Sequence, residues 1–289
     1  MADETLISWA DMTFNPWIGC TRISPACDGC YAAHLMETRM GRAQWGGPGK
    51  GSGTRERTSV ANWRKPIAWD KKAKAEGRRP FVFCSSLADV FDNEIDHEWR
   101  ADLFALIHDT PNLVWLLLTK RPQNIVKMFD QISHVREAWP RNAAIGTTVE
   151  DQKRADANLP ALQVASIELQ PAFTFGSFEP LIGPIKILPS MMPDWVITGG
   201  ETDQGSHKAR PTHPDWFRGL RDQAAACGAA FHHKQNGEWV QAGHESILSA
   251  TENLPVDHSL GRLMVRVGKK RSGRMLDGVT HDAFPEVRR

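Results

Sequence analysis

The chain has 289 residues, which is enough for one large domain or two small ones. Its 41% hydrophobic and 24% charged residues are typical of a globular protein, and the net charge of +1 gives no reason by itself to expect a nucleic-acid or membrane partner. The N-terminal stretch has acidic residues and no apolar core, and no run approaches about 18 apolar residues, so we predict neither a signal peptide nor a transmembrane helix, and expect a cytoplasmic protein.

Short apolar segments recur along the chain, with helical patterns between them. Two of these segments, 113–119 and 195–198, are nearly continuous apolar runs, which is typical of strands covered on both faces in a parallel sheet. We predict strands at Leu6–Phe14, Phe81–Ser85, Leu113–Thr119, Ala143–Val149, Phe173–Phe178, Trp195–Thr198 and Ala229–Lys234.

Two of the intervening segments carry clear helix signals. Asp96 is placed to cap a helix whose apolar residues at 99, 103, 106 and 107 share one face. Pro214 suits the first turn of a later helix, and Gly228 suits its end. Because strands and helices alternate and no glycine-rich dinucleotide fingerprint follows the first strand, we predict an α/β fold, built as a full or partial parallel (β/α) barrel.

We treat residues 1–289 as a single domain. Residues 1–250 are predicted to form the barrel-like body, and residues 251–289 a C-terminal appendage. The glycine-rich segment Gly41–Ser59 is predicted to be a flexible inserted loop, either over an active-site mouth or as a disordered excursion.

Three cysteines lie within eleven residues, directly after the first predicted strand: Cys20, Cys27 and Cys30. Pro25 and Gly29 mark this stretch as a turn-rich loop, which argues against cysteines that only pack in a core. Five cysteines in the whole chain are too few for a disulfide scaffold, and in a reducing compartment clustered cysteines are typical metal ligands. Three thiolates on one loop can hold a metal centre and leave a coordination position open.

The residues alone leave two metals open. Structural zinc needs four ligands, and only one C-x2-C pair is present, although His34 could complete a Cys3His site. An iron–sulfur cluster also prefers thiolates, and three cysteines would leave one iron of a [4Fe–4S] cluster free for a substrate or cofactor. Cys84 is the other possible fourth ligand, although its position in a predicted strand favours a place in the barrel wall, and Cys227 is expected to pack.

Polar residues stand at the end of almost every predicted strand. In a parallel barrel these carboxyl ends meet on one rim, where active sites are built, so the sequence favours an enzyme. Each residue also has a plainer explanation, since cations there can pair with helix carboxylates, Glu179 can cap a helix, and a glycine pair can form a tight turn. The rim residues are Ser85, Ser86, Lys120, Arg121, Glu150, Glu179, Gly199, Gly200, Glu201, Lys234 and Gln235.

The three-cysteine loop resembles that of the radical S-adenosylmethionine superfamily, although its first gap is six residues rather than three. Gly29 stands where that superfamily has an aromatic residue just before the third cysteine. More narrowly, the chain resembles a bacteriophage and prophage three-cysteine-motif family of uncharacterised activity. The matching stretches are NPWIGCTRISPACDGCYA, FCSSLADVF, LLLTKRP, IGTTVEDQ, SFEPLIGPI, WVITGGET, ARPTHPDWFRGLRDQ, HHKQNGEW and VGKKRSGRMLDG.

The resemblance implies that Cys20, Cys27 and Cys30 hold a [4Fe–4S] cluster, whose open iron chelates S-adenosylmethionine for radical chemistry. The polar strand ends, rather than the resemblance, give the other predicted site residues. We expect Glu201 and Lys234 to be catalytic. The expected cofactor-binding residues are Ser85, Ser86, Lys120, Glu179, Gly199 and Gly200.

The expected partners are a reductant protein and a nucleic-acid substrate. The nucleic acid is suggested by the phage context and by the basic runs Lys71–Arg79 and Lys269–Arg274. No membrane partner is expected. The alternative is a non-catalytic metal-binding protein, with zinc or a closed cluster, that acts through a partner.

Overall fold

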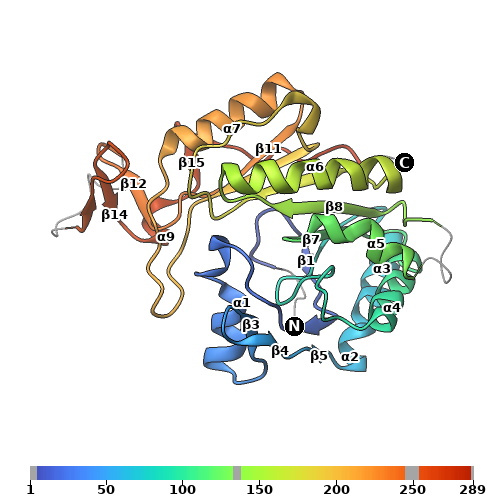
Figure 1. Cartoon of the computed structure of the whole chain (residues 1–289). Coiled ribbons are helices and arrows are strands. Elements are labelled where there is room, and N and C mark those ends of the chain that lie inside the picture. The colour runs from blue at the N-terminus through green and yellow to red at the C-terminus, as the bar shows by residue number, and fades with distance from the viewer. Residues whose placement is uncertain (1–4, 133–137, 245–253, 288–289) are drawn as a thin grey trace.

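A single parallel sheet forms the body of the protein in the computed structural model, which describes residues 5–132, 138–244 and 254–287 (Figure 1). All six neighbouring strand pairs are parallel, and the strands follow one another in chain order. The sheet curls into half of a barrel, which confirms the predicted partial (β/α) barrel. The seven strands are β1 Met12–Thr13, β6 Phe81–Cys84, β7 Val114–Thr119, β8 Ala143–Thr148, β9 Thr174–Phe178, β10 Trp195–Gly199 and β11 Ala230–Gln235.

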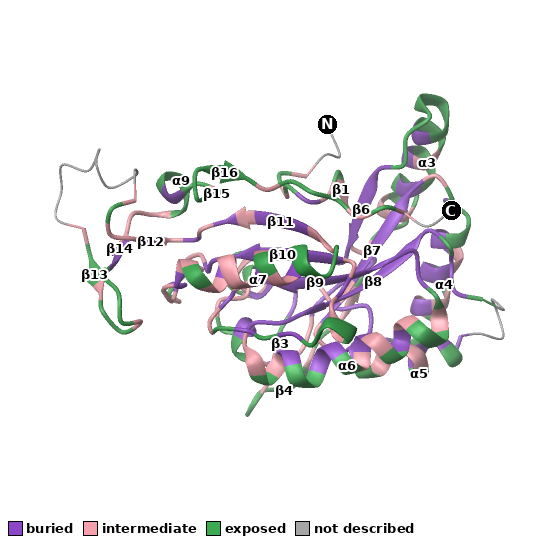
Figure 2. Ribbon diagram, turned by 90° about the horizontal axis from the view of Figure 1, so that it is seen from above, coloured by how far each residue is buried: buried purple, intermediate pink, exposed green. Residues whose placement is uncertain are grey.

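Helices cover one face of the sheet, which we call the outer face (Figure 2). Because side chains alternate along a strand, every second residue of β6 and β7 packs against these helices, as Val82 and Leu117 do. Asp96 caps α4 by accepting a hydrogen bond from the N–H of Glu98, and Pro214 begins α7, as predicted. The larger helices are α3 Lys65–Glu76, α4 His97–His108, α5 Ile125–Asp130, α6 Gln152–Leu169 and α7 Pro214–Ala226.

The first strand is much shorter than predicted. Only Met12–Thr13 pairs with β6, whereas the preceding residues form a turn in which the N–H of Ala10 donates to the carbonyl of Ile7. This turn directs Trp9 into the apolar cluster on the opposite, inner face of the sheet. The prediction of a strand over residues 6–11 is therefore wrong, because Trp9, with Ile7 and Ala10 beside it, packs into the half-barrel instead of extending its sheet.

The C-terminal residues complete two parts of the body. The N–H of the Trp195 indole donates to the carbonyl of Ala283, and Phe284 packs on Trp195 at the amino ends of the strands. Upstream of this, β12 Trp239–Gln241 pairs with β14 Met264–Arg266, so strands from both sides of the predicted boundary at residue 250 share one small sheet. The remaining C-terminal elements are β13 Val256–Asp257, α9 Lys269–Ser272, β15 Met275–Leu276 and β16 Val279–Thr280.

The glycine-rich segment 41–59 is not an irregular loop. It contains a hairpin of β3 Trp45–Gly47 and β4 Gly51–Gly53, followed by β5 Glu56–Arg57, which pairs with β2 Trp17–Ile18. Trp45 is buried against Ala32 and Met36, just after the cysteine loop. Composition suggested flexibility here, but the glycines allow two strands to approach and turn tightly. Over the described part of the chain, no helix is both long and apolar enough to cross a membrane.

Candidate functional site at the carboxyl ends of the strands

The three cysteines lie on the loop between β2 and the short helix α1 (Tyr31–Ala33). Cys27 is buried, whereas Cys20 and Cys30 are half-buried, and all three thiols are free. Cys30 begins α1, where its Sγ accepts a hydrogen bond from the N–H of Ala33 at 3.5 Å. Gly19 bridges to Ala88, beyond the end of β6, so the loop is attached to the rim of the half-barrel.

A buried ion pair holds the Cys20 end of the loop. Nη1 of Arg121 lies 3.0 Å from Oδ2 of Asp89 and 3.7 Å from Sγ of Cys20, and its Nη2 donates to the carbonyl of Thr21 at 2.9 Å. Burial raises the pKa of Cys20 to about 12, and Asp89 adds to this rise while Arg121 opposes it. The sequence placed Arg121 on the rim but assigned it no role in the site.

Lys120, predicted to bind a cofactor, lies near enough to the three cysteines for their charge to act on its ammonium group. Burial alone would lower its pKa, but the negative charge that Cys27, Cys30 and Cys20 carry when ionised outweighs this, and the pKa of Lys120 is raised. Its backbone N–H donates to Asp89. The end of β7 therefore places two cations, Lys120 and Arg121, beside the cysteine loop.

The middle of the cysteine loop is held by the start of α6. The N–H of Ala26 lies 3.4 Å from Oε1 of the buried Glu150, and Nη2 of Arg154 donates to the carbonyl of Ile23 at 2.9 Å. Asp151 caps this helix by accepting from the N–H of Arg154. Glu150 and Arg154 thus fix the backbone that leads to Cys27.

The segment between β10 and α7 also holds the loop, at Pro25 and at Asp28. Glu201 accepts hydrogen bonds from the backbone and side chain of Arg210, both at 2.8 Å, and Nη2 of Arg210 donates to the carbonyl of Pro25 at 3.0 Å. Burial raises the pKa of Glu201, but the hydrogen bonds from Arg210 outweigh it and the pKa is lowered. Glu201, predicted to be catalytic, therefore anchors Arg210, and a catalytic role for it remains a prediction.

Glu179 and Lys234 form one ion pair on the rim. Nζ of Lys234 lies 2.7 and 2.8 Å from the two carboxylate oxygens of Glu179, and Nε2 of Gln235 donates to the same carboxylate at 2.9 Å. A Cβ on Gly199 would lie 2.9 Å from this carboxylate, and the N–H of Gly200 already donates to the carbonyl of Gln235. The structure gives both glycines a packing role, so their use in binding a cofactor stays a prediction.

Two serines follow β6. Oγ of Ser86 accepts a hydrogen bond from Nδ2 of Asn15 at 3.1 Å. Oγ of Ser85 is buried and has no hydrogen-bond partner among the residues that the structure describes. A buried hydroxyl left unpaired is costly and is rare in folded proteins, but the binding of a cofactor by either serine stays a prediction.

Several candidates lie away from the cysteine loop. Cys84 packs in the outer-face core, where burial raises its pKa, and Cys227 is exposed at the end of α7. His232 packs between Trp195 and Phe284, whereas His233 lies against α7. In the described ranges, no group of three or more His, Cys, Asp or Glu side chains is gathered as a site for one metal ion.

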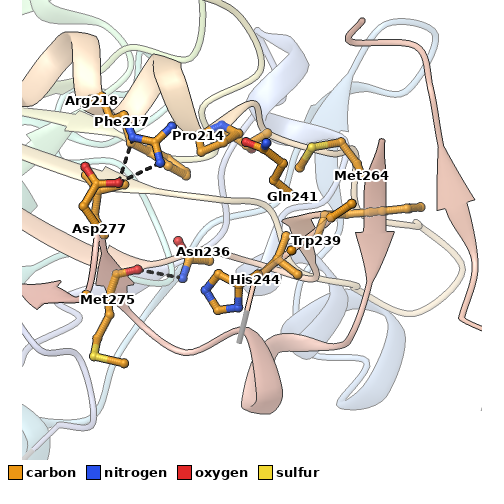
Figure 3. A pocket seen from close by; sticks show the side chains of 16 residues that line it. Pro214, Phe217, Arg218, Asn236, Trp239, Gln241, His244, Met264, Met275 and Asp277 are labelled. Carbon is orange, nitrogen blue, oxygen red and sulfur yellow. Dashed lines mark hydrogen bonds and ion pairs between the residues drawn. The ribbon is translucent and has the colours of Figure 1, made fainter. Parts of the chain in front are cut away.

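A separate cavity of about 370 Å³ lies between α7 and the C-terminal strands (Figure 3). Trp239, Met264 and Phe217 give it an apolar wall, and the ion pair of Arg218 with Asp277 stands at its side. None of the predicted site residues lines it. The cavity is therefore distinct from the cysteine loop.

Sequence reasoning missed His207, Arg210 and Arg154. Each reaches the cysteine loop from more than a hundred residues away: Arg210 contacts Pro25, Arg154 contacts Ile23, and the ring of His207 lies against Gly29. No local sequence motif predicts contacts between residues so far apart in the chain. The stretch ARPTHP, which begins at Ala209, indicates only a helix start at Pro214 and the match to the resembled family.

No curated protein matches the chain. Two solved structures of spore photoproduct lyase are similar to it. One is a mutant with bound AdoMet and dinucleoside spore photoproduct, with 8% identity, a TM-score of 0.44, and coverage of 92% of this chain and 71% of that chain. The other, complexed with dinucleoside spore photoproduct, has 7% identity, a TM-score of 0.46, and coverage of 93% and 72%.

These comparisons leave the bacteriophage and prophage source untested, and it stays a prediction. A protein-family model also matches almost the whole chain. Residues 4–285 match the family described as "Protein of unknown function (DUF5131)", and the chain belongs to this family.

Proposed function

We propose that this protein is an iron–sulfur enzyme that uses S-adenosylmethionine, with Cys20, Cys27 and Cys30 as the ligands of a [4Fe–4S] cluster. One observation carries the proposal. Three free cysteines share one loop, fixed on the carboxyl rim of a partial parallel barrel, and two cations, Lys120 and Arg121, follow β7 beside this loop, where Arg121 contacts Cys20. Active sites of parallel barrels lie at this rim.

The chemistry of the donor set fits such a cluster. Thiolates are the usual ligands of iron–sulfur clusters, and neighbouring cations offset their negative charge. The unpaired Oγ of Ser85 gives the same rim a hydrogen-bonding group for a bound cofactor. When bound, the cluster and S-adenosylmethionine supply radical chemistry, while the protein supplies binding, orientation and exclusion of water.

The rim residues divide these tasks. The ammonium group of Lys120, beside the cysteines, is suited to bind the carboxylate of S-adenosylmethionine. Glu179 and Lys234 form a pair whose charges can each be offered to a polar substrate. Glu201 acts through Arg210, which keeps the Cys27–Cys30 end of the loop in place.

We also propose that the substrate is a nucleic acid. Lys269 and Lys270 are exposed on α9, and the N–H of Lys269 donates to the carboxylate of Glu238. The other oxygen of Glu238 accepts from the N–H of Asp203, within the segment that holds the cysteine loop. These contacts link one basic run to the site, whereas the run Lys71–Arg79 is on and after α3, on the outer face.

Metal analysis of the anaerobically purified protein tests the cluster. We expect about four irons per chain, with matching sulfide, and loss of most of the iron in Cys20→Ala, Cys27→Ala or Cys30→Ala. Cys227→Ala is the matched control and should keep its iron. Stoichiometric zinc without iron would overturn the proposal and favour the non-catalytic metal-binding alternative.

Cofactor cleavage needs a separate test. The reconstituted protein, reduced with dithionite and mixed with S-adenosylmethionine, should release 5′-deoxyadenosine. Lys120→Met should weaken S-adenosylmethionine binding about tenfold, since a charge-assisted hydrogen bond contributes roughly 1.5 kcal/mol or more. An iron-loaded protein that releases no 5′-deoxyadenosine would favour a closed or purely structural cluster.

The salt dependence of DNA binding tests whether the substrate is a nucleic acid. The logarithm of DNA affinity should fall with the logarithm of salt concentration, and Lys269→Ala with Lys270→Ala should lower the slope by about 0.9 for each phosphate that the variant no longer neutralises. Lys72→Ala with Lys74→Ala, on α3, is the matched control. If both double variants bind DNA like the wild type, the basic run on α9 is not the interface.

A further inference from the structure

The cavity between α7 and the C-terminal strands is walled on one side by the small sheet of β12 and β14. Trp239 and Gln241 are alternate residues of β12, so their side chains lie on the same face of the strand. Met264 of β14 stands directly opposite Gln241 in the antiparallel register and shares that face. All three residues line the cavity, together with Phe217 and Pro214 of α7. One face of the small sheet and the start of α7 therefore enclose it.

The size and the entrance of the cavity suit one small group. Its volume of about 370 Å³ is near the lower end of the range of about 300–1,000 Å³ that is typical of small-molecule sites. Met275 and Gly278 line it and are exposed, so a ligand can enter from solvent. Asp277 stands at the same edge, but it pairs with Arg218 and with Arg221, each at 2.7 Å, so its negative charge is offset.

The amide of Gln241 is the polar group that a ligand in this cavity can use. The side chain is half-buried, and it has no hydrogen-bond partner among the residues that the structure describes. Figure 3 shows this amide directed toward Pro214. An amide offers one acceptor and two donors. The amide of Asn236 also lines the cavity, but its Nδ2 already donates to the carbonyls of Ser272 and Met275.

The basic run on α9 adjoins the cavity. Ser272, whose carbonyl accepts from Asn236 at 2.8 Å, is the last residue of α9. Lys269 and Lys270 on the same helix are exposed. A ligand with a ring inside the cavity and phosphate groups outside it therefore finds apolar walls for the ring and cations for the phosphates.

We propose that the cavity binds one unpaired base of a nucleic acid, whose phosphates lie along α9. The proposal rests on the proposed function, because it requires a nucleic-acid substrate. Apolar and aromatic walls suit the faces of a base, and an amide such as that of Gln241 can pair with its edge. Nε1 of Trp239 donates to the carbonyl of Ala209 at 2.8 Å, in the segment that holds the cysteine loop. None of the predicted site residues lines the cavity, so the base bound here is a neighbour of the reacting nucleotide.

Two DNA duplexes that differ by a single base test this. One carries a bulged adenosine, and the other has an abasic site at the bulge, so both offer the same phosphates. The wild type should bind the bulged adenosine about tenfold more tightly than the abasic bulge, as expected when one base stacks on an aromatic side chain. Gln241→Ala and Trp239→Leu should each lose most of this preference, whereas Trp239→Phe keeps a ring and should retain most of it.

The salt dependence separates the base from the phosphates. Gln241→Ala should bind the abasic duplex like the wild type and with the same salt slope, because its phosphate contacts are unchanged. Lys269→Ala with Lys270→Ala should lower the slope for both duplexes and keep the preference for adenosine. Gln131→Ala, an exposed glutamine that follows α5, is the matched control and should change neither quantity.

The outcomes distinguish the two proposals. If the wild type binds neither duplex, the nucleic-acid substrate and the role of the cavity both fall. If it binds both duplexes equally well, the substrate stands and only the role of the cavity is wrong. A preference for adenosine that survives in Gln241→Ala and Trp239→Leu would place the base elsewhere and overturn the proposal. Should Trp239→Leu fail to fold, Gln241→Ala and Trp239→Phe decide in the same way.

Discussion

The two ends of the half-barrel are built from different chemistry. At the amino ends of the strands, the rings of Trp9, Phe81, Phe173 and Trp195 pack together on the inner face, and Phe284 closes over them. At the carboxyl ends, buried or half-buried charged groups meet instead. The first arrangement gains free energy by removing apolar surface from water, whereas the second must offset the cost of burying charge.

The buried charges at the carboxyl ends are harder to explain by stability than the packed rings at the amino ends. Asp89 and Asp92 are buried at the carboxyl end, where Arg121 and Arg55 pair with them. Replacing a buried ion pair by apolar residues is often neutral or stabilising, so stability alone gives little reason to place one beneath the cysteine loop. We interpret the charged end as the part that serves the site and the aromatic end as the part that holds the body together.

The largest loss of stability is expected at the aromatic end. Trp195→Ala removes a fully buried indole that packs among several other aromatic rings, and we expect it to lower the free energy of unfolding by about 4 kcal/mol. Chemical denaturation measures this change. The iron content of the folded fraction should equal that of the wild type, and a selective loss of iron would contradict the division between the two ends.

Arg121→Met tests the charged end of the half-barrel. It leaves Asp89 buried without its cation, which should cost roughly 3 kcal/mol of stability, and it should also lower the iron content, because Arg121 holds Thr21 beside Cys20. Adding Asp89→Asn removes the unpaired charge. The double variant should recover part of the stability without recovering iron; recovery of both would mean that Arg121 serves only the core.

Strand patterns and local spacing were enough to predict the body. The apolar runs of β6 to β11 and the caps of α4 and α7 are short-range signals, and the structure has these elements close to the predicted bounds. The strand prediction failed at residues 6–11, and the glycine content of residues 41–59 did not indicate the hairpin there, because composition does not reveal which partner a segment packs against. Trp9 and Trp45 are both buried by residues outside their own segments.

The candidate site was predictable only in part, for the same reason. The cysteine spacing and the polar strand ends identified the rim, and the structure pairs Glu179 with Lys234 across that rim. The contacts of Arg210 and His207 with the cysteine loop depend on how the segment between β10 and α7 folds back, which no periodicity encodes. Glu201 was correctly placed on the rim, but its partner could not be deduced from spacing.

Acidification should lower the stability of the body of the protein. Burial lowers the pKa of His232 and of His233 from the ordinary 6.5 to about 4. The unfolded chain therefore binds more protons between these values, so stability should fall as the pH drops from about 6.5 toward 4, by about 2 kcal/mol for each histidine at pH 5.

Denaturant titrations at pH 7 and pH 5 measure this loss. His233→Asn should be less stable than the wild type at pH 7 but should lose about 2 kcal/mol less on acidification. An unchanged pH dependence in His233→Asn would show that this histidine is not responsible. His232 contacts the rings at the aromatic end, whereas Glu179 and Lys234 belong to the charged end. The loss of stability on acidification therefore reports on a part of the body away from that ion pair.

The smallest change in stability is expected for Glu179→Gln. The pair with Lys234 is partly exposed, and such pairs contribute about 1 kcal/mol or less, so the variant should unfold almost like the wild type. It should instead slow turnover, measured as release of 5′-deoxyadenosine, because glutamine keeps the shape of the side chain while removing the charge opposite Lys234. The exposed pair of Lys72 with Glu76 is the matched control, since Glu76→Gln should alter neither stability nor turnover. If Glu179→Gln is as active as the wild type, the charge of this pair has no part in the reaction, and the functional part of the rim narrows to the surroundings of the cysteine loop.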